Sequence, residues 1–163
     1  MAGNNYSPYK VIDVTPTLST AAYVDGDILF NKVEIPQAVI GNGGTSELIN
    51  VTVTSKKASW TELEVAIFTN NQSLDSANDP FDITAAHGAA AGFLGWVEFP
   101  AAGALDCGDF TFGNPVPAVG KPQIPFLLQA ASDSDSVYFV AIVRDGVTYA
   151  DGDLTFRFHI KQS

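Results

Sequence analysis

The sequence predicts an all-β protein: a single-domain antiparallel β-sandwich, jelly-roll-like, with about eight strands and at most one short helix. The first indication is a period-two alternation of apolar and polar residues, which is typical of strands that bury one face. The second is that the apolar runs are short and lie between segments rich in Gly, Asn, Asp, Ser and Pro, which favour turns. The third is a length of 163 residues without a linker-like change in composition, which suits one core.

The strands follow one another along the whole chain. They are expected at residues 9–15, 27–35, 47–56, 61–70, 93–99, 124–130, 136–144 and 153–161. The alternation is clearest in "DLTFRFHIK", whose apolar side is formed by Leu154, Phe156, Phe158 and Ile160. In "ELINVTVTSK" the inward side is expected to be Ile49, Val51 and Val53. These patterns predict strands that each turn one face toward the core.

Two segments differ from this pattern. A short helix is expected within "DITAAHGAAAG", residues 82–92, with Asp82 as its N-cap and with two glycines that limit its length. Residues 1–10 have no apolar periodicity, so they are expected to form an extended arm before the domain at 11–163. Such an arm cannot offset its own ordering entropy, and partner contacts should therefore order it.

Charge and cysteine content narrow the functional classes. The chain has 8 basic and 18 acidic residues, a formal net charge of −10, which disfavours binding to nucleic acid. It has no apolar signal region and no apolar run near the about 18–20 residues that span a bilayer, so we expect synthesis in the cytosol and no membrane partner. The single cysteine, Cys107, excludes an internal disulfide and a zinc site made of cysteines.

One pattern occurs twice. "YVDGDILF" covers residues 23–30 and "YADGDLTF" covers residues 149–156. Asp-Gly favours a tight turn, and the residues after it begin an alternating strand, so we interpret both copies as the same turn before a strand. The alternative is a calcium site made by Asp25, Asp27, Asp151 and Asp153. The spacing of a calcium-binding helix-loop-helix site is absent, and we expect neither a metal nor a cofactor.

No catalytic motif is found, and the chain is not expected to be an enzyme. Glu62 and Glu64 share one strand face, which suits a glycosidase but is more typical of solubilising charge. His87, His159 and Cys107 have no motif neighbours. A carbohydrate-binding module is another hypothesis, because aromatic side chains can stack on sugar rings. The candidate aromatic residues are Trp60, Trp96, Tyr6, Tyr9, Tyr23 and Tyr149. Of these, Trp96 is expected in the core or at an interface.

The stretch "VIDVTPTLSTAAYVDGDILFNKVEI" carries a family resemblance. It resembles the N-terminal part of small virion structural proteins of tailed bacteriophages, including marine and cyanobacterial phages. The positions that carry the resemblance are Asp13, Val14, Thr15, Thr17, Leu18, Thr20, Tyr23, Gly26 and Asp27. The stretch "PFLLQAASDSDSVYFVAIVRDGVTYADGDLTFRFHI" resembles the C-terminal hairpin and final strand of the same family. Residues 70–120 match nothing in it.

The resemblance implies a non-enzymatic capsid decoration (cement) protein on the outer capsid surface of the virion. This chain would form a homotrimer. The homotrimer would bind the major capsid protein and stabilise the shell. The alternative is a tail- or fibre-associated module that binds glycans on the host surface. Interface residues are expected to be Tyr6, Tyr9, Tyr138, Val140 and Ile142. The last three lie on a second apolar face of 136–144, and the short alanine-rich helix is expected to be a poor cover for it.

Overall fold

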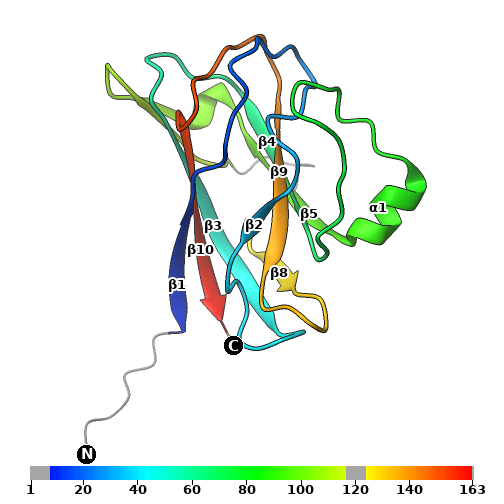
Figure 1. Cartoon of the computed structure of the whole chain (residues 1–163). Helices are drawn as coiled ribbons and strands as arrows, with labels where there is room; N and C mark the ends of the chain where they lie inside the picture. The colour runs from blue at the N-terminus through cyan, green and yellow to red at the C-terminus, as the bar shows by residue number, and fades with distance from the viewer. Residues whose placement is uncertain (1–7, 117–123, 163) are drawn as a thin grey trace, which may run out of the picture.

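The structure, a computed structural model, describes residues 8–116 and 124–162 and shows two antiparallel sheets packed face to face (Figure 1). The described residues form ten strands, one α-helix and one 3-10 turn. The side chains between the two sheets make one large apolar cluster. This arrangement confirms the predicted β-sandwich.

The sheets have six and four strands. The six-stranded sheet contains β1 (Tyr9–Val14), β10 (Leu154–Gln162), β3 (Thr45–Ser55), β7 (Thr111–Gly113) and β6 (Ala104–Asp106), with β8 (Phe126–Gln129) also paired to β3. The four-stranded sheet contains, in order, β2 (Val33–Ile35), β9 (Val137–Val143), β4 (Leu63–Phe68) and β5 (Phe93–Phe99). The α-helix α1 covers Ala85–Ala91 and the 3-10 turn covers Ala101–Gly103.

Strand pairing follows a nested order. β1 pairs with β10, β2 with β9, β3 with β8 and β4 with β5, so the first long strand meets the last and the pairs close inward along the chain. This nesting gives the sheet orders β1-β10-β3-β8 and β2-β9-β4-β5, which are those of an eight-stranded jelly roll. The small β6–β7 hairpin is an addition between β5 and β8.

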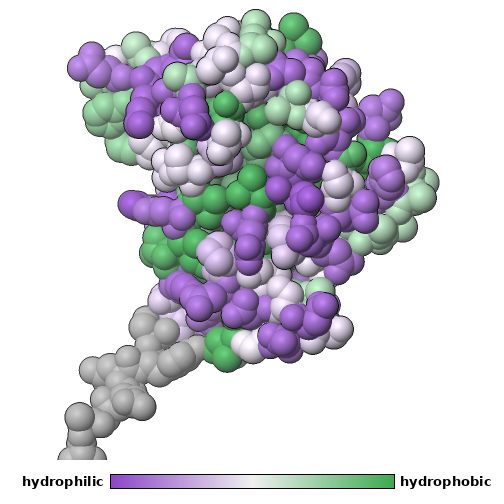
Figure 2. Space-filling view, viewed as in Figure 1, coloured by the Kyte–Doolittle hydropathy of each residue, from purple (hydrophilic) through white to green (hydrophobic). Residues whose placement is uncertain are grey.

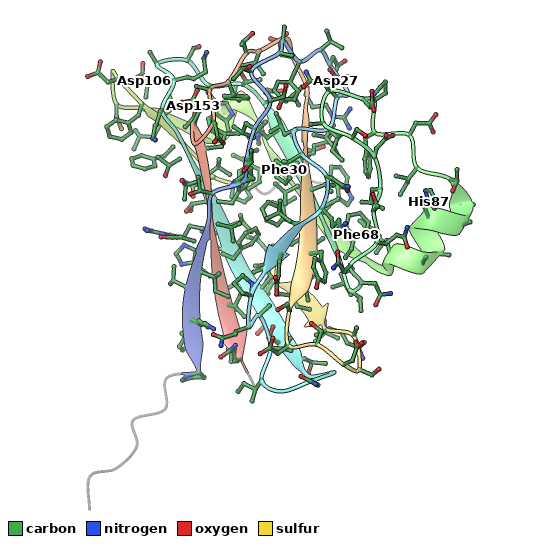
Figure 3. All side chains as sticks on the ribbon, viewed as in Figure 1. Asp27, Phe30, Phe68, His87, Asp106 and Asp153 are labelled. Atoms are coloured by element: carbon green, nitrogen blue, oxygen red, sulfur yellow. The ribbon has the colours of Figure 1, made fainter. Side chains whose placement is uncertain are left out.

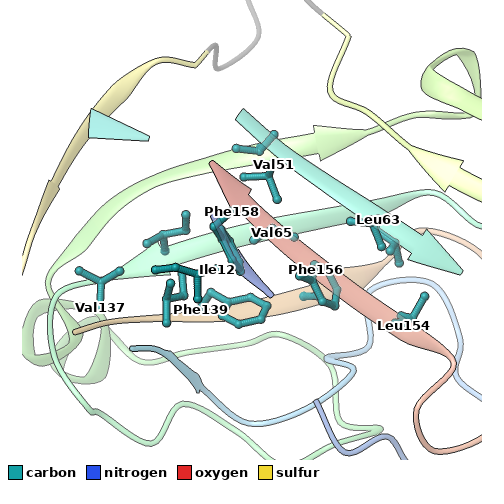
Figure 4. Close-up of a cluster of buried hydrophobic side chains, with 14 of the residues drawn as sticks. Ile12, Val51, Leu63, Val65, Val137, Phe139, Leu154, Phe156 and Phe158 are labelled. Carbon is teal, nitrogen blue, oxygen red and sulfur yellow. The ribbon is translucent and has the colours of Figure 1, made fainter. Parts of the chain in front are cut away.

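Phenylalanine rings fill the centre of the core. Phe139 of β9 lies between the sheets, with its ring centroid 4.9 Å from that of Phe158 and 5.2 Å from that of Phe156, both on β10 (Figure 4). Phe30 completes the group at 5.3 Å from Phe139. All of these ring pairs meet edge to face, the arrangement that aromatic quadrupoles favour. One aromatic cluster therefore joins the middle strands of both sheets.

The alternation in β3 is interrupted by a bulge. His159 of β10 pairs with Asn50, whereas the next residue, Ile160, pairs with Leu48, so Ile49 is an extra residue on β3. Leu48 and Val51 consequently both face the core, and Ile49 is 37% exposed. The prediction that Ile49 faces inward is therefore wrong, because the bulge changes which residues point inward.

The structure also differs from the predicted strands at β2, which is shorter than expected, and at β6 and β7, which were not predicted. Of the predicted strand at 27–35 only Val33–Ile35 is formed, and Ile28 makes an isolated bridge with Ile142. The strands β6 and β7 are too short to give an alternation signal. β7 ends at Gly113, where a Cβ atom would lie 2.1 Å from the ring of Trp60, so this close approach requires glycine.

The short helix is present, but Asp82 does not cap it. Thr84 is the N-cap, and its side chain accepts a hydrogen bond from the backbone N–H of His87 at 3.2 Å. The helix ends at Gly92, whose φ of 68° is the left-handed conformation that glycine favours. Of the predicted arm at 1–10, Tyr9 and Lys10 belong to β1, and residues 1–7 lie outside the described residues.

We predict that Phe139→Ala lowers the free energy of unfolding by about 3–5 kcal/mol, because it removes the ring that joins the two sheets and leaves a cavity. Urea denaturation followed by circular dichroism measures the loss. The matched control is Phe93→Ala, because Phe93 is 56% exposed and its truncation should cost less than about 1 kcal/mol. Equal losses for the two variants would contradict the central role of Phe139.

Candidate interaction surfaces

The outer face of β9 is covered by the same chain. Val140 is fully buried and Ile142 nearly so. A second apolar cluster lies on this face and comprises Ile28, Ala66, Phe68, Leu74, Ala91 and Val140, with Phe81, Ile83 and Trp96 packed against it. α1 contributes only Ala91, and most of the cover comes from the irregular residues that precede the helix. The expectation that this face lacks a cover within the chain is therefore wrong.

The five predicted interface residues consequently fall into different environments. Val140 and Ile142 present almost no surface to a second subunit. Tyr138 is partly exposed on β9, and Tyr9 is 63% exposed on β1. Tyr6 lies outside the described residues. Only Tyr9 and Tyr138 therefore remain as described candidates for an interface.

Exposed apolar side chains occur on the outer face of the six-stranded sheet. We call this surface the β1–β8 face and define it by Tyr9, Val11, His159, Ile49 and Leu127. Tyr9, Val11 and Leu127 are each more than half exposed. Val11 lies beside His159, which pairs with Asn50. In the neighbouring row, the ion pair of Lys161 and Glu47 separates Tyr9 from Leu127. Figure 2 shows hydrophobic residues over and beside β1 on a mainly hydrophilic surface.

His159 has an unusual position in this face. Its Nε2 atom is buried and has no hydrogen-bond partner among the described residues. An unpartnered buried nitrogen costs free energy, and a group from outside the chain could reach it only if the His159 side chain moved. The β1–β8 face thus combines exposed apolar side chains with the ion pairs Lys161–Glu47 and Arg157–Asp13.

The candidate catalytic residues are not brought together. His87 lies on α1, and Cys107 lies in the turn beside Asp106, on the opposite side of the molecule (Figure 3). Glu62 accepts a hydrogen bond from the backbone N–H of Ala101 at 3.0 Å, and Glu64 pairs with Arg144. Among the described residues, no group of three or more His, Cys, Asp or Glu side chains could hold a metal ion.

The repeated octapeptides form the same turn at the same end of the sandwich (Figure 3). In each turn the second aspartate, Asp27 or Asp153, donates its backbone N–H to the carbonyl three residues earlier at 3.1 Å. Its carboxylate accepts the backbone N–H of that earlier residue at 2.8 Å. Gly26 and Gly152 have φ values of 91° and 77°, as this turn requires. Both carboxylates therefore accept hydrogen bonds from backbone N–H groups of their own turns.

The tyrosines of the two octapeptides are part of the core. Tyr23 and Tyr149 have ring centroids 6.3 Å apart, and both side chains are buried. The Tyr23 hydroxyl donates to the carbonyl of Leu29 at 3.0 Å. Burial raises the pKa of Tyr149 to about 12, and a hydrogen bond with Thr61 opposes this shift. Neither tyrosine ring is available to stack on a sugar.

Trp60 and Trp96 also have different environments. Trp60 donates its indole N–H to the carbonyl of Phe99 at 3.1 Å and packs over Gly113, so its role is structural. Trp96 lines a groove of about 350 Å³ on the outer face of the four-stranded sheet. We call it the Trp96 groove, and its lining residues are Glu64, Ala66, Phe81, Phe93, Trp96, Ile142 and Arg144.

An acidic hollow continues from the Trp96 groove. This hollow, of about 170 Å³, shares Glu64 and Arg144 with the groove and adds Glu62 and Glu98. The hydrogen bond from Arg144 to Glu64 raises the pKa of the guanidinium, and Asp25 and Glu98 add to this effect. The groove could not be predicted from the sequence, because its residues come from separate segments. The one local signal was Trp96 within an alternating strand.

Comparisons with known proteins assign no family to this chain. No family model, no curated protein and no solved structure matches it. Within the part of the chain that the structure describes, no helix is long and apolar enough to cross a membrane. We therefore infer function from the surfaces of the protein and from the resemblance of its sequence to small phage virion proteins.

We predict that Val140→Glu destabilises the fold rather than altering its association. A carboxylate at this fully buried position has no described cation to pair with inside the apolar cluster, which should cost about 3–5 kcal/mol. Val11→Glu is the control, because Val11 is exposed on an edge strand and the variant should melt within a few degrees of the wild type. Thermal melts followed by circular dichroism measure the melting temperature of each variant. A Val140→Glu protein that melts close to the wild type would contradict the prediction.

We predict that Tyr149 makes the fold sensitive to alkali. Its pKa is raised, so the neutral form contributes stability that is complete below about pH 10 and is lost as the pH rises through about 12. The free energy of unfolding of the wild type should therefore fall by roughly 1–3 kcal/mol over this range. Urea titrations at several pH values should show a shallower fall for Tyr149→Phe, whereas Tyr9→Phe, changed at an exposed position, should follow the wild type.

Proposed function

We propose that this protein is a non-enzymatic structural component of a tailed-bacteriophage virion, a capsid decoration protein. It binds the outer surface of the head and stabilises the shell, with the major capsid protein as its partner. The observation that carries the proposal is the β1–β8 face, a sheet surface on which exposed apolar side chains lie among paired charged residues. The resemblance of residues 11–35 and 125–160 to small phage virion proteins supports the choice of partner.

The residues that carry this resemblance build the fold. Arg157 donates two hydrogen bonds to Asp13, at 2.7 and 2.8 Å, which lock β1 to β10 and lower the pKa of Asp13. Tyr23 is core, and Asp27 closes a turn. The resemblance is therefore one of architecture. The attachment contacts must come from other, exposed residues, and the β1–β8 face provides such residues.

A sheet surface of this kind suits attachment to a lattice. Each apolar contact that is removed from water contributes about 25 cal/mol per Å², and association costs offset much of that gain. A homotrimer bound at a three-fold position would repeat the same weak contacts three times, and effective concentration would then raise the overall affinity. Tyr9 and Val11 lie directly after the N-terminal residues 1–8, so the face and these residues could engage the same neighbouring subunits.

The jelly-roll topology supports the proposal only by analogy. Jelly rolls occur in viral capsid proteins, in lectins and in cupin enzymes, so the fold does not select one function. The surface chemistry supports one choice among them. Exposed aliphatic side chains on β1, β3 and β8 support a protein partner over a small polar substrate.

The test measures attachment to phage heads. Particles of the phage that encodes this chain, grown without it, are incubated with purified protein, separated on a gradient and analysed by quantitative mass spectrometry. We expect hundreds of wild-type copies per particle. The double variant Tyr9→Ser/Val11→Ser should bind at least about tenfold less, because it removes two exposed apolar contacts at each copy.

The matched control is Val24→Ser/Ile40→Ser, which removes two exposed aliphatic side chains outside the β1–β8 face. It should retain wild-type occupancy, and all three proteins should melt at similar temperatures. A handful of copies per particle would instead favour the tail- or fibre-associated alternative. Equal binding by both double variants would show that the β1–β8 face is not the attachment surface.

A further inference from the structure

The Trp96 groove lies on the sheet opposite the β1–β8 face. From its geometry and charge we propose that this groove binds a cationic side chain, a lysine or arginine that a partner protein presents. The proposal does not depend on the capsid assignment, because it is carried by the residues of the groove. A protein attached through the β1–β8 face would leave this groove facing away from its attachment site.

The aromatic part of the groove fits the stem of such a side chain. Trp96 of β5 stands opposite Ala66 of β4, and the small Ala66 side chain leaves room beside the indole. Phe81 and Phe93 also line this part of the groove, and Phe93 is mostly exposed. Lysine and arginine stems pack on apolar surfaces of this kind, and their charged ends are attracted to aromatic faces, most strongly to tryptophan.

The acidic part fits the charged end. Glu64 and Glu98 stand opposite each other on β4 and β5, one outward position along the strands from Ala66 and Trp96, about 7 Å away. Glu62 lines the same hollow, and Asp25 lies 4.0 Å from Arg144. Four carboxylates therefore surround one described guanidinium, and the local excess is negative, as it is for the whole chain.

Arg144 shows that a guanidinium fits beside Glu64. Each carboxylate has about four lone-pair sites, so these glutamates can accept further donors from a ligand in addition to their present partners. The excess negative charge distinguishes among ligands. It attracts a cation and repels phosphate or sulfate groups, whereas a neutral sugar gains nothing from it.

The test uses two peptides, N-acetyl-tetra-arginine amide and N-acetyl-tetra-aspartate amide, with the full-length protein. Binding is measured by isothermal titration calorimetry at low and high salt, and the indole N–H signals of Trp60 and Trp96 are followed by NMR. We expect the arginine peptide to bind saturably, to shift the Trp96 signal more than the Trp60 signal, and to weaken with salt. The aspartate peptide should not bind.

Variants separate the groove from general charge attraction. Trp96→Leu and Glu98→Gln should each weaken binding about five- to tenfold, as expected for loss of a cation–aromatic contact or of a charged partner. Glu47→Gln is the matched control, because it removes one carboxylate from the opposite sheet and should change affinity less than about twofold. Circular dichroism melts verify that each variant is folded.

Three outcomes would overturn the proposal. Equal weakening by Glu98→Gln and Glu47→Gln would show that the peptide senses only the net charge. Absence of binding by the arginine peptide would exclude a cation site. A shift of the Trp96 signal by maltohexaose, without one by the arginine peptide, would identify a glycan groove instead.

Discussion

The packing of Phe139 against Phe156 and Phe158 is the contact on which the rest of the structure depends. β9 lies inside the four-stranded sheet and β10 inside the six-stranded sheet, so these rings join the two sheets at strands that are hydrogen-bonded on both sides. Edge strands such as β1 and β5 contribute less to this centre. Their outward positions can therefore carry exposed aromatic and charged side chains without loss of the core.

The outer faces of the two sheets differ in how much of each is covered by irregular segments of the chain. Across the four-stranded sheet, an irregular segment with Leu74, Phe81 and Ile83 buries the middle of the face. That cover ends beside Trp96, and its edge forms one wall of the groove. The six-stranded sheet has no comparable cluster among the described residues, so its outward side chains stay exposed. The distribution of irregular chain, more than strand composition, thus determines where each surface lies.

Local alternation was sufficient to predict the long strands, because in β10 and β4 every second residue faces the core regardless of distant partners. Local alternation did not predict features that depend on a paired strand or on a distant segment of the chain. The bulge at Ile49 depends on pairing with β10, the three-residue strands β6 and β7 depend on each other, and the cover over Val140 depends on residues about 60 positions away. Tyr9 could be predicted as a surface residue from its local sequence. The Trp96 groove could not, since it requires the pairing of Trp96 with Ala66 and the position of Phe81.

The nested pairing has a consequence for synthesis on the ribosome. β10 lies between β1 and β3, and the contact from Arg157 to Asp13 joins residues 144 positions apart. The hairpin of β4 and β5 can therefore form early, while β1 and β3 leave the ribosome long before their shared partner exists. Such non-local topologies fold slowly and expose unpaired strand edges while they wait. Until β10 inserts and closes the sheet, each nascent chain therefore presents strand edges with which another copy can pair.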